Sequence, residues 1–273
     1  MTIFQKIIKN LSIAFAIFLA ISIISGILSA VLLLANITGL NKHKWNLDDI
    51  NWEAYSNLTS CLDVDIAYSN LTIKSGEKFL AQSNNEGIQC TQDGNKIVIK
   101  EKKANWFSFS KKETSEWTIY IPMNLEFEEV KISNGAGKVN IEQIVTKDLK
   151  LNLGAGETII EKIITEKAKV DTGTGAFTIK SGKISNLDFD IGIGESNITA
   201  QITGNNKIDT GIGAVNLNII GRKDDYKISI DKGIGEVKIE NEKISDSATI
   251  GNGQNNIKIN SGIGAVNVAF NEE

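Results

Sequence analysis

The chain has 273 residues, of which 41% are apolar and 23% charged, so it is long enough for one large folded domain and too apolar for wholesale disorder. A single proline excludes collagen-like and polyproline-rich architectures, and a single histidine excludes any metal site or mechanism that needs two imidazoles. Two cysteines exclude a cysteine-rich disulfide scaffold and a four-cysteine zinc site. All 33 acidic residues follow residue 45, together with 25 lysines and arginines, and the resulting net charge of −8 disfavours a nucleic-acid partner.

Residues 11–34 form an uncharged, predominantly apolar run that would span about 36 Å as a helix, enough for the roughly 30 Å core of a bilayer. Lys6 and Lys9 precede the run as in a secretory signal, but no clear small-residue cleavage site follows it. We therefore predict a short cytoplasmic tail and a retained transmembrane signal anchor in residues 1–41, then a juxtamembrane linker in residues 42–59. A cleaved signal peptide is the alternative.

The orientation of this anchor is set by a small charge difference, because Lys42 and Lys44 nearly balance the two lysines before the run. The α-amino charge and the long folded mass after the run favour a single-pass protein of the cell membrane with its domain outside the cytoplasm. A domain that faces the cytoplasm is the alternative.

From residue 130 to 270 the sequence repeats a G-x-G motif between stretches of alternating polarity. The first five copies are 19 residues apart and two more follow after longer intervals; their first glycines are Gly135, Gly154, Gly173, Gly192, Gly211, Gly233 and Gly262. The G-N-G at residues 251–253 is a candidate degenerate corner. Alternation predicts strands with one buried face, and a fixed period near 20 predicts a solenoid whose turns stack as rungs.

The 19-residue period assigns inward-facing residues to three columns. The first column is Ile132, Leu151, Val170, Phe189 and Ile208. The second is Val139, Thr158, Phe177, Ser196 and Val215, and the third is Ile141, Ile160, Ile179, Ile198 and Leu217. Glycines on both sides of one residue suit a sharp corner between strands, where a positive φ or a close backbone approach is needed.

Residues 60–128 are also rich in strand patterns but less regular, with an Asp93-Gly94 turn typical of a hairpin. We predict that they form the irregular N-terminal cap region of one domain that spans residues 60–273, because the end of a solenoid must be covered. A separate small sandwich is the alternative. The fold class is therefore all-β: a single-stranded, β-helix-like solenoid of about 19-residue rungs with G-x-G corners, preceded by one transmembrane helix.

Several motifs in this order resemble a family of bacterial β-strand-repeat proteins of unknown function, the DUF4097-type "putative adhesin" group that includes LiaG- and LiaX-like envelope proteins. The matching motifs are L-D-V-D-I, N-L-T-I-K, I-Y-I-P at Pro122, the serial G-x-G units, D-Y-K-I-S-I-D-K-G-I-G-E-V-K-I at residues 225–239 and the final N-S-G-I-G-A-V-N-V-A-F. The resemblance covers about residues 60–270. It implies a β-solenoid-like fold, a membrane anchor, a role in envelope stress or surface interaction, and no established catalytic residues.

The G-x-G motifs do not predict a phosphate site, because each copy opens a strand and a phosphate-binding glycine loop opens a helix. Asp171, Asp190 and Asp209 share one column with Ser133 and Asn152, so a calcium site is an alternative to a solvated face. The solvated face is favoured because lysines stand two residues earlier in most rungs: Lys131, Lys150, Lys169 and Lys207.

Cys61 and Cys90 have opposite strand phases, which argues against a bridge between them.

One segment mixes bases with aromatic side chains and is the predicted interaction patch: Lys102, Lys103, Trp106, Phe107, Phe109, Lys111 and Lys112. Aromatic side chains that cover the solenoid end are the alternative. The sequence thus predicts a non-catalytic, membrane-anchored adhesin or envelope-interaction protein with no cofactor, no metal and no nucleic acid. Its partner would be an envelope protein, a wall polymer or an anionic lipid. An enzyme that acts on polysaccharide and a cytoplasm-facing regulator are the alternatives.

Overall fold

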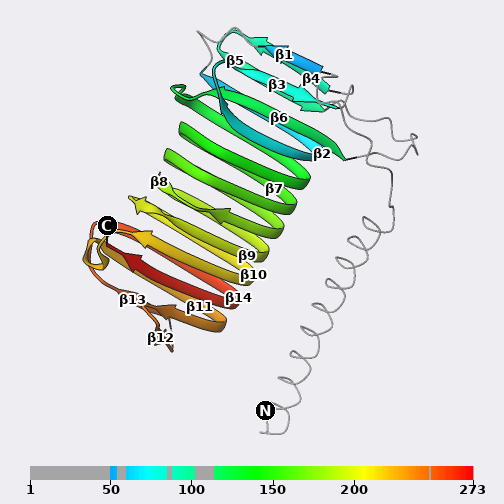
Figure 1. Ribbon diagram of the computed structural model, residues 1–273. Helices are drawn as coiled ribbons and strands as arrows, with labels where there is room; N and C mark the ends of the chain where they lie inside the picture. Colours follow the sequence, from blue (N-terminus) through cyan, green and yellow to red (C-terminus); the bar gives the residue numbers. More distant parts are fainter. Residues whose placement is uncertain (1–49, 54–59, 85–87, 102–113, 246, 273) are drawn as a thin grey trace, which may run out of the picture. The chain divides into compact units, whose positions relative to one another are not determined.

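The computed structural model describes residues 50–53, 60–84, 88–101, 114–245 and 247–272. Within these ranges no helix is both long enough and apolar enough to cross a membrane. The predicted anchor and most of the linker fall outside them. The described residues of the 46–273 unit form a stack of parallel β-rungs (Figure 1).

Fourteen strands of the described part belong to one sheet. The N-terminal strands are β1 (Ile50–Glu53), β2 (Cys61–Gly76), β3 (Leu80–Ser83), β4 (Ile88–Asp93), β5 (Lys96–Glu101) and β6 (Ser115–Pro122). The central strands are β7 (Phe127–Ile179), β8 (Gly182–Ser185), β9 (Leu187–Thr203) and β10 (Asn205–Ile220). The C-terminal strands are β11 (Tyr226–Ile239), β12 (Glu242–Ile244), β13 (Ala248–Ile250) and β14 (Asn255–Asn271), and a 3₁₀ helix, η2 (Lys223–Asp225), precedes β11.

The 19-residue period is the register of the sheet. Val170 of β7 pairs with Phe189 of β9, and Phe189 pairs with Ile208 of β10, all in parallel. A rung turns first at its G-x-G motif and again before a short third side, which β8 forms between β7 and β9. Asn186, whose φ is 54°, ends that side and leads into the next rung. The predicted all-β solenoid-like architecture is confirmed.

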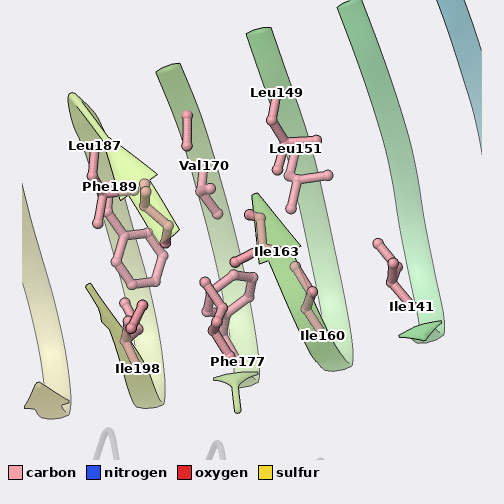
Figure 2. Packing of buried hydrophobic residues seen from close by; sticks show 14 of the residues in the cluster. Ile141, Leu149, Leu151, Ile160, Ile163, Val170, Phe177, Leu187, Phe189 and Ile198 are labelled. Atoms are coloured by element: carbon pink, nitrogen blue, oxygen red, sulfur yellow. The ribbon is translucent and has the colours of Figure 1, made fainter. Parts of the chain in front are cut away.

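The core lies inside the stack, where the three predicted columns are buried (Figure 2). The rings of Phe177 and Phe189, on neighbouring rungs, pack with centroids 5.0 Å apart. Thr158 and Ser196 occupy the same column as Phe177 and are equally enclosed, at 4% and 1% exposure. Small residues next to a large aromatic allow the layers to interdigitate, so the column stays filled although its side chains differ in volume.

The C-terminal rungs do not stack in chain order. β14, the last strand, lies between β10 and β11, and pairs in parallel with both (Figure 1). Ile263 thus lies between Ile212 and Ile234. The candidate corner at residues 251–253 is a correction: this segment is not part of a strand and leads from β13 into β14, with Gly253 N–H donating to the Tyr226 carbonyl.

The N-terminal end has the same kind of order. β2 lies between β7 and an outer rung made by β5 and β6, which pair in parallel with its first and second halves. Antiparallel strands then cover both ends of the stack: β4 on β5, β3 on β6 and β1 on β3 at one end, β12 and β13 on β11 at the other. Such strands turn the parallel stack into short antiparallel edges, which are poorer templates for further pairing.

Candidate interaction surface

The G-x-G corners form one edge of the stack and need glycine at both positions. The second glycine of each motif from Gly137 to Gly264 has φ between +127° and +151°, a region that L-residues rarely adopt. Space is equally restrictive, because a Cβ on Gly175 would lie 1.7 Å from the Gly156 carbonyl oxygen on the next rung. The result is two adjacent lanes of backbone that carry no side chains.

A single column of side chains stands between the two glycine lanes. In spatial order it contains Tyr68, Ala136, Ala155, Thr174, Ile193, Ile212, Ile263 and Ile234. The end residues are the most open, Tyr68 at 44% and Ile234 at 60% exposure. The column therefore changes from small side chains beside β7 to stacked isoleucines from β9 to β11.

An open groove of about 560 Å³ runs beside the first glycine lane, where that column is small. One side of the groove carries one polar side chain per rung, Asp65, Ser133, Asn152 and Asp171. The other side is backbone at Ala67, Gly135, Gly154 and Gly173. Ile66 and Leu153 contribute apolar surface between them. We call this feature the corner groove.

Asn134 also lines the corner groove, although it is only 3% exposed. Its Nδ2 donates to the Ser69 carbonyl at 3.1 Å, while its Oδ1 has no hydrogen-bond partner. A buried acceptor without a donor costs free energy unless a ligand or water completes it. The groove therefore contains an acceptor that is held in place and still available.

The column of acids and amides continues beyond the groove as a ladder across the rungs. Asp171 pairs with Asp190, Asp190 with Asp209, and Asp209 with Asn260, as the sequence period predicts for the first three. Burial, then a hydrogen bond and repulsion from Asp209, raises the pKa of Asp190. Burial also acts to raise the pKa of Asp209, but hydrogen bonds from Lys207 and Asn260 outweigh it and lower that pKa.

No group of three or more metal-ligating side chains is assembled in the described part of the chain, the aspartate ladder included. Enclosed cavities at the corner and beside β6 measure about 20 and 10 Å³, close to the space that one water molecule needs. Neither has room for a substrate.

Ion pairs between rungs occupy much of the remaining outer face. Lys147 binds Glu128 at 2.8 Å, and Lys180 binds Glu161 at 2.7 Å, each across 19 residues. These side chains are about half exposed, so each pair contributes little stability but favours the correct register. The predicted balance of charge on this face is present in the structure.

The seven residues of the predicted patch, Lys102 to Lys112, lie outside the described residues. Both cysteines are free. Cys61 pairs with Lys96 and Cys90 with Ile99, so they face different positions of β5. Burial raises the pKa of the Cys90 thiol to about 11, which makes it a poor nucleophile near neutral pH.

Sequence reasoning did not identify Asp65 or Asn134 as groove residues. Asp65 belongs to the same column as Asp171 but lies in the irregular region, 68 residues before its pairing partner Ser133. Asn134 was visible as an amide at an inward position where neighbouring rungs carry Ile66 and Leu153. An amide at such a position is the signal that could have indicated a buried polar group.

Comparison with known proteins gives structural likeness at low sequence identity. A "putative cell adhesion protein" from Clostridium sporogenes is 15% identical, with 81% of this chain and 98% of the other covered and a TM-score of 0.37. A "putative adhesin" from Bacteroides fragilis is also 15% identical, with 81% and 96% covered and a TM-score of 0.39. No curated protein sequence matches the chain.

The family assignment comes from the sequence model of a domain family. The model described as Toastrack DUF4097 matches residues 59–269, which is most of the chain and nearly all of the β-stack. The chain belongs to the Toastrack DUF4097 family.

Proposed function

We propose that this protein is a non-catalytic interaction module of the cell surface, which presents the outer face of its β-stack to another envelope component, as an adhesin does. The observation that carries the proposal is the corner edge, with its continuous side-chain column and an open groove that extends over several rungs. Backbone pairing on both sides holds each rung, so binding groups on this edge are positioned before a ligand arrives.

The proposal includes the location of the domain. Residues 11–34 would anchor the chain in the cell membrane, with the β-stack outside the cytoplasm. The net charge of −8 after residue 45 would keep the stack away from anionic lipid headgroups and leave it free to meet a partner.

Attachment assays on living cells test the proposed activity. Cells that lack the protein should attach less to surfaces and to one another, and the wild-type chain should restore attachment. The Gly175→Ala variant, whose corner clashes, should not restore it. Unchanged attachment after deletion, or release of soluble sugar from wall material by the purified full chain, would refute a non-catalytic adhesin.

Cysteine labelling tests the location. In a chain with Cys61→Ser and Cys90→Ser, the exposed Lys223 is replaced by cysteine and intact cells are treated with a membrane-impermeant maleimide. Labelling before lysis is expected. Labelling only after lysis would place the stack in the cytoplasm and favour a regulator.

A further inference from the structure

We infer that the corner groove binds an extended peptide segment that carries lysine or arginine side chains four residues apart. This inference rests on the proposed function, because it names the chemical class of partner that the presented edge would recognise. It is carried by the hydrogen-bonding groups, the charges and the spacing of the groove.

The free groups that line the groove are mainly acceptors. Asp65 and Asp171 form no ion pair with another described residue, and Asn134 Oδ1 has no donor. Asn152 donates its Nδ2 to Ser133 Oγ, which leaves its own carbonyl oxygen as a further acceptor. A ligand that satisfies these groups must be rich in N–H donors and positively charged, as an ammonium or guanidinium group is.

The lysines closest to the groove are mostly engaged elsewhere. Lys150 binds Glu129 and lies 3.4 Å from Asp148, and Lys169 is paired with Asp188. The two groove aspartates are therefore not neutralised by these neighbours. The excess of acids after residue 45 also attracts a cationic partner toward the stack.

The spacing of the two aspartates selects the form of the ligand. Asp65, Ser133, Asn152 and Asp171 stand on successive rungs, so the two carboxylates are three rung steps, or about 14 Å, apart. In an extended peptide, residues i and i+4 point to the same side and are about 13 Å apart. The glycine wall of the groove leaves room for the main chain of such a peptide to lie close to the rungs.

Two peptides of identical composition test the spacing. Fluorescein-labelled Gly-Lys-Ser-Ser-Ser-Lys-Gly carries its lysines at i and i+4, and Gly-Lys-Ser-Lys-Ser-Ser-Gly carries them at i and i+2. Fluorescence anisotropy with the purified full chain in detergent should show tighter binding of the first peptide. Equal binding of both peptides, or no binding of either, would overturn the inference.

Matched charge variants test the site. The double variant Asp65→Asn, Asp171→Asn should bind the i, i+4 peptide about tenfold more weakly, since it removes two partly exposed charge pairs. The control Asp224→Asn, Asp225→Asn changes the net charge equally at exposed positions of η2 and should bind as the wild type does. Unchanged melting temperatures establish that both variants are folded. Equal weakening by both variants would reduce the effect to overall charge and overturn the site, as would Ca²⁺ alone displacing the peptide at equimolar concentration.

The attachment assay separates this inference from the proposed function. If the groove variant loses both peptide binding and cell attachment, both are supported. If it binds peptide normally while deletion of the protein abolishes attachment, the groove assignment fails and the adhesin proposal stands.

Discussion

At the scale of single residues, the glycine lanes are the most restrictive feature of the molecule. Neighbouring rungs stand one strand spacing apart, and at the corner the carbonyl of one rung points at the Cα of the next. Carbonyl oxygens lie within 1.6–2.5 Å of the position that a Cβ would take at the glycines that stack on another glycine. Alanine would have to displace backbone that is itself paired on both sides, so relaxation is costly.

This argument predicts the effect of Gly175→Ala. The substitution adds a Cβ at 1.7 Å from the Gly156 oxygen and at φ +145°, and should lower the free energy of unfolding by about 3 kcal/mol or more. Gly94→Ala is the control, since Gly94 has φ +56° in a turn with nothing within 4 Å, and should cost about 1 kcal/mol. Urea unfolding measures both, and equal losses would show that the corners do not depend on this close approach.

The aspartate ladder predicts a pH-dependent change of stability. The pKa of Asp190 is raised in the folded protein, so its contribution favours folding at low pH and is lost as the pH rises through that pKa. Asp190→Asn should therefore raise the stability at pH 7 by about 0.5 kcal/mol, because it removes a solvent-screened like-charge pair with Asp209. The gain should disappear near pH 3, where both aspartates are protonated.

Asp209→Asn is the matched comparison for this ladder. The pKa of Asp209 is lowered, so its carboxylate stabilises the fold above the pKa of the unfolded chain and that contribution is lost as the pH falls. The substitution should lower the stability at pH 7, opposite in sign to Asp190→Asn. Thermal melts at the two pH values decide the matter, and the same sign for both variants would contradict the assignment of charges within the ladder.

At the scale of the strands, the sequence identified the rungs but not their order at the C-terminal end. The motifs at Gly233 and Gly262 both continue the G-I-G pattern of Gly211, so hydrophobic periodicity does not distinguish them. The outward residues do. Asn260 and Asn267 of β14 donate to Asp209 and to Asn216 of β10, the latter at 2.8 Å.

The charges explain why β14 rather than β11 follows β10. If β11 lay directly on β10, Asp231 would stack on Asp209, because both occupy the position of Asn260. Like charges directly opposite each other destabilise a sheet, and an interposed amide removes that contact. The polar columns therefore contained the information on strand order that the apolar columns lack.

Disulfide trapping tests this order. In a chain with Cys61→Ser and Cys90→Ser, the pair Ala214→Cys and Ala265→Cys should form a bridge, because these residues oppose each other on β10 and β14, about 4.8 Å apart. The pair Ala214→Cys and Glu236→Cys should not, since β14 separates those residues by two rung steps, roughly 9.6 Å. Mass spectrometry after mild oxidation reads out both pairs, and the reverse result would restore a stack in chain order.

At the scale of the whole molecule, the regular part of the stack follows directly from the sequence period, whereas its ends do not. Each central rung contacts the one before and the one after it, so a pattern of 19 residues suffices to place its core residues. The ends are set by contacts between distant segments, such as β2 with β5, β6 and β7, that no local period encodes. The corner groove lies partly on such a junction, which is why only its β7 residues could be predicted.

A stack built from equivalent rungs should tolerate the loss of one of them. Deletion of residues 168–186 joins Lys167 to Leu187 in the same phase, so β9 can pair with the preceding rung of β7. The shortened chain should unfold cooperatively in urea, with an m-value that falls in proportion to the surface removed. Deletion of residues 168–177 takes away half a rung, misaligns the glycine lanes with the strands below, and should abolish folding. If circular dichroism found both deletions equally unfolded, the rungs would not be interchangeable and the contact between Phe177 and Phe189 would be essential to the core.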